Sequence, residues 1–181
     1  MASIDNDILE LLPTNGEKAM SMVYEHYYQQ LCIKAIRYVK DQKTAEDLVQ
    51  DLFVDIWKKR ENLNINTSLI GYLQRSIVNK SLNWIRSQRV QIEDIDSVKS
   101  TSDNTADAQD LIEKTELEEH ITKVIDGLPE KCRLVFVMSR FDLLSYKEIG
   151  KKLDISTKTV ENQISKALRI LRSEMKNFAK I

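Results

Sequence analysis

The last stretch of the chain carries a row of polar and basic side chains that could bind the edges of DNA bases. At about 100° per residue, one side of the segment 157–176 is apolar and predicts an amphipathic helix. The apolar side holds Val160, Ile164, Ala167, Leu168 and Leu171. The opposite side holds Lys158, Asn162, Ser165, Lys166 and Arg169. Amides, hydroxyls and cations can reach base edges and phosphates in a major groove. An ordinary solvated helix face is the alternative interpretation.

A second, shorter helix should stand just before that segment. Ser145 and Glu148 have the spacing of a capping box, which predicts a helix from there through Lys152. The residues 153–155 would form the turn, and Ser156 or Thr157 would cap the last helix. A short helix, a tight turn and a longer helix form the helix-turn-helix pattern. This pattern favours DNA binding over the solvated face, although the turn lacks the frequent glycine.

A further polar row occurs in the segment 68–89, which also has helical periodicity. Ile70, Leu73, Ile77 and Trp84 should face inward. The other side collects Arg75, Asn79, Asn83 and Arg86, flanked by Lys80 and Arg89. Such a surface, together with the polar loop 61–67 before it, suits single-stranded bases, with the cations on the backbone. Taken alone this evidence is weak, because arginine and asparagine also occur on inert helices.

Three carboxylates, Asp47, Asp51 and Asp55, recur every four residues beside Gln50. They could suggest a metal site or an acid–base pair. A metal site would normally need ligands from a second segment, and the two histidines, His26 and His120, lie in no ligand motif. A protein-docking strip or a solvated face is therefore favoured over a metal site. The chain also has no glycine-rich phosphate loop and no nucleophile–base motif, so we expect no catalytic residue, no metal, no cofactor and no enzyme activity.

The elements that position these faces are predicted to be helices throughout. With four glycines and two prolines, the chain is poor in the residues that make tight turns, which favours an all-α fold over a sandwich or barrel. A short helix should end near Pro13, and amphipathic helices should follow over 17–40 and from a capping box at Thr44 and Asp47. A helix over 111–126 and one with Pro129 in its first turn should precede the helix-turn-helix. The aromatic side chains predicted to be core are Tyr24, Tyr27, Tyr28, Phe53 and Trp57.

Charge divides the chain into blocks. The net charge is −4 over residues 1–17, +5 over 18–90, −8 over 91–120 and +6 over 121–181. Two basic blocks suggest an anionic partner such as nucleic acid. Within the acidic stretch, residues 97–110 are mostly Ser, Thr, Asp and Asn. This composition predicts a flexible acidic linker over 91–110 between an N-terminal domain, 1–90, and a C-terminal domain, 111–181. The first domain should be a three- to four-helix bundle and the second a four-helix domain.

The cellular setting follows from what the sequence lacks. No apolar run approaches the roughly 18–20 residues that cross a bilayer, and the N-terminus has no signal-peptide pattern. We therefore expect a cytoplasmic protein without membrane insertion. Cys32 and Cys132 lie far apart in apolar surroundings, which indicates buried thiols in a reducing compartment.

With these motifs in place, the sequence resembles the extracytoplasmic-function (ECF) group of bacterial sigma factors in the sigma-70 superfamily. The resemblance covers nearly all of 18–90 and 111–181. In the first domain it is carried by the block 45–57 (AEDLVQDLFVDIW) and by 72–79 (YLQRSIVN). In the second it is carried by 128–130 (LPE), 144–149 (LSYKEI) and 156–160 (STKTV). The helix-turn-helix alone is shared with many regulators, whereas its combination with the first block is specific.

The resemblance implies a role for each face in promoter-directed transcription initiation by RNA polymerase. The strip of Asp47, Gln50, Asp51 and Asp55 would bind core RNA polymerase. The face of Arg75, Asn79, Lys80, Asn83 and Arg86 would engage the melted −10 element. The last helix would recognise the −35 element through Lys158, Glu161, Asn162, Ser165, Lys166 and Arg169. An anti-sigma factor is the expected inhibitory partner.

Two departures from the family pattern and two competing functions remain. Glu161 and Asn162 make the outer face less basic than in many relatives, and Gly150 stands where alanine is usual, which predicts a slightly looser helix. A stand-alone helix-turn-helix regulator, with 18–90 as a dimerisation or ligand module, would bind promoters without polymerase. An enzyme using the carboxylates of 47–55 would depend on a divalent metal.

Overall fold

A computed structural model describes residues 4–63, 65, 68–93 and 116–178, without the side chains of 89–93. The chain divides into two compact units, Met1–Asp107 and Ala108–Ile181. Every regular element of the described residues is a helix, which confirms the all-α prediction. The division falls inside the stretch 91–110 that was predicted as a linker, and most of that stretch lies outside the described residues.

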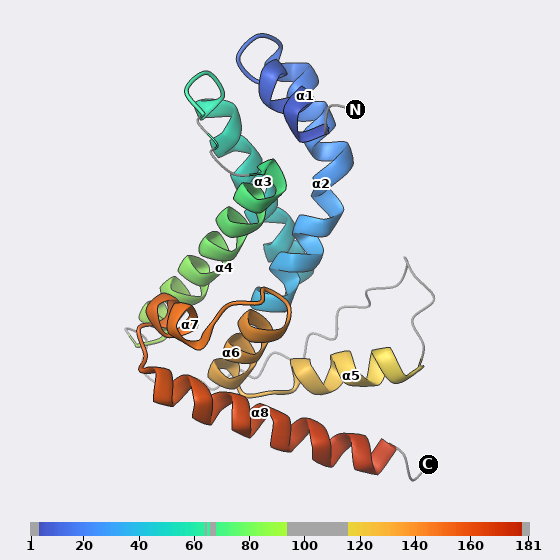
Figure 1. Cartoon of the computed structure of the whole chain (residues 1–181), viewed down its shortest axis with the longest axis vertical. Coiled ribbons are helices and arrows are strands. Elements are labelled where there is room, and N and C mark those ends of the chain that lie inside the picture. Colours follow the sequence, from blue (N-terminus) through green and yellow to red (C-terminus); the bar gives the residue numbers. More distant parts are fainter. Residues whose placement is uncertain (1–3, 64, 66–67, 94–115, 179–181) are drawn as a thin grey trace. The chain divides into compact units, whose positions relative to one another are not determined.

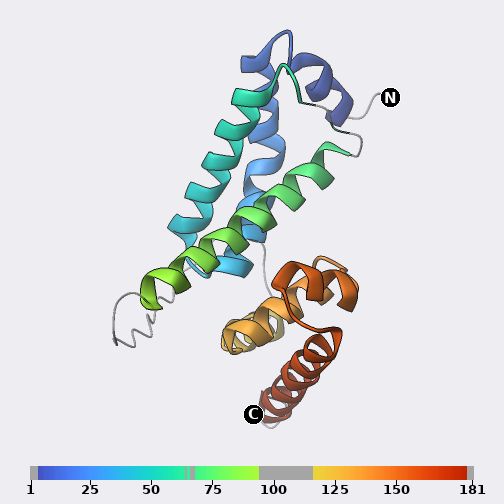
Figure 2. The same ribbon diagram turned by 90° about the vertical axis from the view of Figure 1, so that its left-hand side faces the viewer.

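The first unit is a bundle built on three long helices. α1 covers Ile4–Leu11, α2 Gly16–Val39, α3 Gln42–Lys59 and α4 Leu69–Glu93. Helices α2, α3 and α4 pack against one another, and the short α1 packs on α2 and also touches α4 (Figures 1 and 2). Apolar residues at helical spacing meet between them; the largest fully buried side chains include Leu31, Tyr38, Leu52, Ile56, Leu73 and Ile77. The three- to four-helix bundle predicted from the sequence is confirmed.

The connection between α2 and α3 corrects one predicted helix start. Lys40 ends α2 in the left-handed conformation with φ 63°, and its N–H donates to the carbonyl of Ile36. The next residue, Asp41, is the N-cap of α3, and its carboxylate accepts from the N–H of Thr44 at 2.7 Å. Hydrogen bonds from Thr44 hold the pKa of Asp41 below its usual range. The capping box predicted at Thr44 was wrong, because Asp41 three residues earlier supplies the cap.

The second unit consists of α5 (Glu116–Asp126), α6 (Glu130–Arg140), α7 (Tyr146–Leu153) and α8 (Thr157–Phe178). Helix α6 is its core element, since seven consecutive residues from Cys132 to Met138 are buried. Helix α8 packs against α5, α6 and α7. Pro129 is the N-cap of α6, one position before the first turn in which it was predicted. The predicted start of α5 at 111 lies outside the described residues.

The aromatic residues of the first unit are less buried than predicted. Tyr27 is in the core, but Tyr24 is 54% exposed and Trp57 38% exposed. Tyr24 stacks on Tyr28 with ring centroids 4.6 Å apart, and both rings lie near Phe53 across α2 and α3. The prediction that all five are core was wrong for Tyr24, because the tyrosines at 24, 27 and 28 spread over more than one side of α2. It was also wrong for Trp57, whose ring lies near the end of α3 under the Arg60 guanidinium.

The two cysteines are free thiols, and neither lies fully in solvent. Cys132 is buried and donates a hydrogen bond to the carbonyl of Gln163 at 3.3 Å, whereas Cys32 is half-buried. Burial raises the pKa of both thiols, which keeps them protonated. Among the described residues, no helix combines the length and the apolar character that crossing a membrane requires.

Leu143, in the loop after α6, is a position where substitution should stabilise the fold. Its φ of 55° lies in the left-handed region, and its side chain is 83% exposed. The left-handed conformation costs a non-glycine residue roughly 1–2 kcal/mol, and glycine loses roughly 0.5–1 kcal/mol of backbone entropy in return. We expect Leu143→Gly to raise the free energy of unfolding by up to about 1 kcal/mol. Urea unfolding measures it, and a clear loss of stability would show that the exposed leucine makes a stabilising contact.

Candidate nucleic-acid interface

The helix-turn-helix is held by local side-chain caps. Ser145 begins α7 with a complete capping box: its Oγ accepts from the N–H of Glu148 at 3.3 Å, and its own N–H donates to Glu148 Oε2 at 2.8 Å. The Ser145 hydroxyl also donates to Glu148 Oε2 at 2.6 Å, and this bond, together with the one from the Ser145 N–H, holds the pKa of Glu148 below its usual range. Asp154 makes the turn in the left-handed conformation with φ 53°, and Ser156 Oγ caps α8 by accepting from the N–H of Thr159 at 3.0 Å. The predicted capping box is confirmed, and Ser156 supplies the cap of the last helix.

Gly150 lies in α7 at the point where the following turn comes closest to the backbone of this helix. It is buried, and a Cβ at this position would lie 2.7 Å from the carbonyl oxygen of Ile155. The turn therefore packs directly on the backbone of α7, and an alanine would force the two apart. The effect of Gly150 on the looseness of α7 stays a prediction, and the close approach of the turn gives a reason for glycine at this position.

The outer face of α8 carries the predicted DNA-binding residues. The exposed members are Lys158, Asn162, Ser165, Lys166 and Arg169. Glu161 is half-buried, and its carboxylate lies 3.1 Å from the Lys158 ammonium. Both side chains of this pair are substantially exposed, so it adds little stability, but it orients Lys158 on the first turn of the helix. The face is therefore open to solvent at the positions expected to contact bases.

The buried side of α8 is narrower than predicted. Val160, Ile164 and Ala167 are buried as expected, but Leu168 is 37% exposed and Leu171 is half-buried. The prediction that Leu168 faces inward was wrong, because Ala167 occupies the central position of the stripe at that turn.

The predicted face on α4 is also largely exposed. Arg75, Asn79, Asn83 and Arg86 point to solvent. Arg86 Nη1 donates to Asn83 Oδ1 at 3.2 Å, which links two of these side chains. On the inner side Leu73 and Ile77 are buried as predicted, whereas Ile70 and Trp84 are only half-buried and Val78, Ser81, Leu82 and Ile85 complete the core. The side chain of Arg89 and the loop residues 64, 66 and 67 lie outside the described part.

An ion pair connects the strip on α3 with the face on α4. The Lys80 ammonium lies 2.7 Å from Asp55 Oδ2, and both groups are partly exposed. The lysine holds the pKa of Asp55 below its usual range. These two residues were predicted to bind different partners, polymerase and DNA, whereas the structure brings them together. The sequence alone could not indicate this ion pair, because the pair depends on how α3 packs against α4.

The rest of the strip on α3 faces solvent. Asp47, Gln50 and Asp51 are exposed, directly above the buried row that includes Leu48 and Leu52. Within the described residues, no group of three histidine, cysteine or acidic side chains could hold a metal ion. His26 is exposed, and His120 is half-buried and stacks on Phe178 with centroids 4.4 Å apart. The carboxylates of 47–55 are thus an open acidic surface without converging ligands.

The sequence reasoning missed two contacts at the ends of the α3–α4 connection. At the C-terminus of α3, the Arg60 guanidinium lies over the Trp57 ring at 4.3 Å and pairs with Glu61 at 3.3 Å. At the start of α4, the N–H of Leu69 donates to Asp5 Oδ2 at 3.0 Å. The spacing of Trp57 and Arg60 along one helix could have indicated the first contact. No sequence signal indicates the second, because 64 residues separate its partners.

Comparison with known proteins places both units in one family. A family model described as Sigma-70 region 2 matches residues 23–90, and one described as Sigma-70, region 4 matches residues 119–171. The ECF RNA polymerase sigma-E factor of Escherichia coli strain K12 is 24% identical over 172 residues, which is 90% of each chain. The ECF RNA polymerase sigma factor SigW of Bacillus subtilis strain 168 is 27% identical over 165 residues, which is 86% of this chain and 87% of SigW.

Solved structures show the same fold. The sigma factor RpoE of Bartonella quintana, in complex with the anti-sigma factor NepR, superimposes with a TM-score of 0.56 and 20% identity over 88% of this chain and 98% of the other. CnrH in complex with the cytosolic domain of CnrY gives a TM-score of 0.54 and 17% identity, with 97% and 99% covered.

Two helical units, the first matching Sigma-70 region 2 and the second, with its helix-turn-helix, matching Sigma-70 region 4, are typical of transcription initiation factors. With both sigma-70 regions matched, the chain belongs to the sigma-70 family of RNA polymerase sigma factors, in its ECF group. The stand-alone regulator is not favoured, because residues 23–90 match a sigma region and not a dimerisation or ligand module.

Proposed function

We propose that the two units contact two separate promoter elements and that the first unit also binds the polymerase. The exposed face of α8 recognises the −35 element, and the exposed face of α4 engages the single-stranded −10 element. The strip of Asp47, Gln50 and Asp51 on α3 binds core RNA polymerase. Asp55 lies at the end of this strip and forms an ion pair with Lys80, which lies at the edge of the α4 face. The chain acts as a dissociable specificity subunit in the cytoplasm and has no catalytic site of its own.

The observation that carries this proposal is the position of the two polar faces within the two matched sigma regions. The α4 face lies in the residues that match region 2, and the α8 face lies in those that match region 4. Both faces are exposed and rich in amides and cations, which suit base edges and backbone phosphates. A protein with two such faces on separate units can bind two promoter elements at once.

An inhibitory partner is part of the proposal. The two structural relatives are described in complex with NepR, an anti-sigma factor, and with the cytosolic domain of CnrY. By analogy, an anti-sigma factor holds this chain inactive until its inducing signal arrives.

The assignment of the faces is tested by transcription with holoenzyme reconstituted from core polymerase and variant chains. The template library is randomised in the −10 element in one arm and in the −35 element in the other. Arg75→Ala combined with Asn79→Ala should change base preference in the −10 arm alone. Lys18→Ala, which removes an exposed cation on α2, is the control and should change neither. A shift in the −35 arm from the α4 variant, or no shift in either arm, would contradict the assignment.

A further inference from the structure

The first N–H group of α4 donates its hydrogen bond to a side chain from outside α4. The first N–H groups of any helix lack partners within the helix. Ser68 satisfies one of them locally, because its Oγ accepts from the N–H of Gly71 at 3.2 Å. The N–H of Leu69, the first residue of α4, instead donates to Asp5 Oδ2 at 3.0 Å. A carboxylate at this place makes a charge-assisted hydrogen bond and also interacts favourably with the helix dipole.

Asp5 is held in place by α2 as well as by α1. Its other oxygen, Oδ1, accepts a hydrogen bond from the hydroxyl of Tyr27, which is only 6% exposed. Burial, together with this carboxylate, raises the pKa of Tyr27, so the hydroxyl remains a donor. Ile8 and Leu12 anchor α1 because both are buried. One carboxylate thus ties together α1, the middle of α2 and the start of α4.

We propose that Asp5 is a positioning residue for the −10 face: it fixes the first turn of α4 and thereby the placement of Arg75, the member of the face nearest to that turn. This inference rests on the proposed role of the α4 face. Arg75 follows Leu69 by six residues, which is about 9 Å along a helix at ~1.5 Å per residue. A frayed or displaced first turn would move Arg75, the nearest member of the face. The remote part of α4, packed through Ile77 and Leu82, would stay in place.

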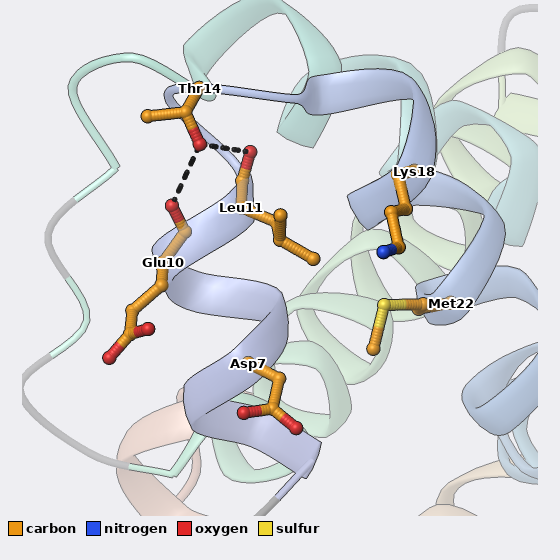
Figure 3. A pocket seen from close by; sticks show the side chains of 6 residues that line it. All are labelled: Asp7, Glu10, Leu11, Thr14, Lys18 and Met22. Atoms are coloured by element: carbon orange, nitrogen blue, oxygen red, sulfur yellow. Dashed lines mark hydrogen bonds between the residues drawn. The ribbon is translucent and has the colours of Figure 1, made fainter.

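The chain offers a matched control for Asp5 on the same helix. Asp7 carries the same charge on α1 but is exposed and lines a shallow hollow between α1 and α2 with Glu10, Lys18 and Met22 (Figure 3). Removing Asp7 changes the net charge of α1 as much as removing Asp5 does. It leaves the hydrogen bonds to Leu69 and Tyr27 intact.

The test compares Asp5→Ala, Asp5→Asn and Asp7→Ala in reconstituted holoenzyme, with transcription from the library randomised in the −10 element. Asp5→Ala should flatten base preference in the −10 element and slow initiation about tenfold, while preference in the −35 element and affinity for core polymerase stay unchanged. Asp5→Asn keeps an acceptor oxygen for Leu69 and should stay within about threefold of the unsubstituted chain, because asparagine caps helices about as well as aspartate. Asp7→Ala should change none of these quantities.

The outcomes separate this inference from the function on which it rests. If Asp5→Ala lowers the melting temperature but leaves −10 preference intact, Asp5 is only a structural cap and the inference is overturned. If Asp5→Ala does not fold, Asp5→Ser, which has one side-chain oxygen in place of the two that accept from Leu69 and Tyr27, replaces it. Altered −10 preference with normal −35 preference then supports the inference, and normal preference in both elements contradicts it. If the double variant at Arg75 and Asn79 leaves −10 preference unchanged, the proposed function of the α4 face is wrong, and the role of Asp5 is wrong with it.

Discussion

Asp51→Lys is expected to weaken binding to core RNA polymerase by at least tenfold without unfolding the first unit. Asp51 is exposed in the middle of the strip, and the buried row beneath it, including Leu48 and Leu52, is untouched by the change. Surface substitutions typically alter stability by no more than ~0.5 kcal/mol, whereas a like charge placed in an interface costs several kcal/mol. A tenfold loss of affinity corresponds to about 1.4 kcal/mol of binding free energy, which is less than the cost of a like charge in an interface.

The measurement is a binding titration of fluorescently labelled chain with core polymerase, together with thermal unfolding of each variant. Glu25→Lys, which reverses an exposed carboxylate on α2, serves as the control and should bind core polymerase normally. Normal binding by Asp51→Lys would remove the strip from the polymerase interface. A large drop in its melting temperature would show that Asp51 is a structural residue.

Asn162→Ala should change which base is preferred at one position of the −35 element. Asn162 is exposed near the N-terminal half of α8, one turn before Lys166 on the same face. Asparagine can bond adenine in two places, and each good pair with a base is worth about 1–3 kcal/mol, or roughly 5- to 150-fold in preference. Loss of the amide removes that discrimination while the buried stripe of α8 is retained.

Arg172→Ala is the matched comparison for this change. Arg172 is also exposed on α8, but it lies ten residues beyond Asn162, about 15 Å along the helix at ~1.5 Å per residue. It should contact a phosphate at most, so its loss should weaken binding to all sequences alike and lessen the salt dependence. Transcription over the library randomised in the −35 element separates the two effects. Equal shifts in preference from both variants, or no shift from either, would show that this face does not recognise bases.

Helix positions and the helix-turn-helix could be predicted from the sequence because both depend on local patterns. Apolar periodicity marked α2, α4 and α8, and the spacing of Ser145 and Glu148 marked the start of α7. Most residues of the polar faces are exposed as expected, since the period of a helix assigns each residue to one side. The family resemblance supplied the partners of these faces, which periodicity alone left open.

The features that could not be predicted depend on contacts between elements. The pairing of Lys80 with Asp55 follows from the packing of α3 on α4, and the hydrogen bond from Leu69 to Asp5 joins residues that are 64 positions apart in the sequence. The need for glycine at Gly150 arises because the turn folds back onto α7, a contact that helix propensity does not describe. The spacing of Thr44 and Asp47 fits a capping box. However, Lys40 ends α2 in the left-handed conformation, and the next residue, Asp41, caps α3.

Multiple-round transcription with purified core polymerase, with and without this chain, on a duplex library of random upstream sequence tests the central claim most directly. Sequencing of the transcripts and their templates identifies every start site that depends on the chain. We predict chain-dependent transcripts whose templates share two short elements, one near the −10 position and one near the −35 position, and no binding to these templates by the chain alone at the same concentration. Transcripts that are the same with and without the chain, or tight promoter binding by the chain in the absence of polymerase, would contradict its role as a sigma factor.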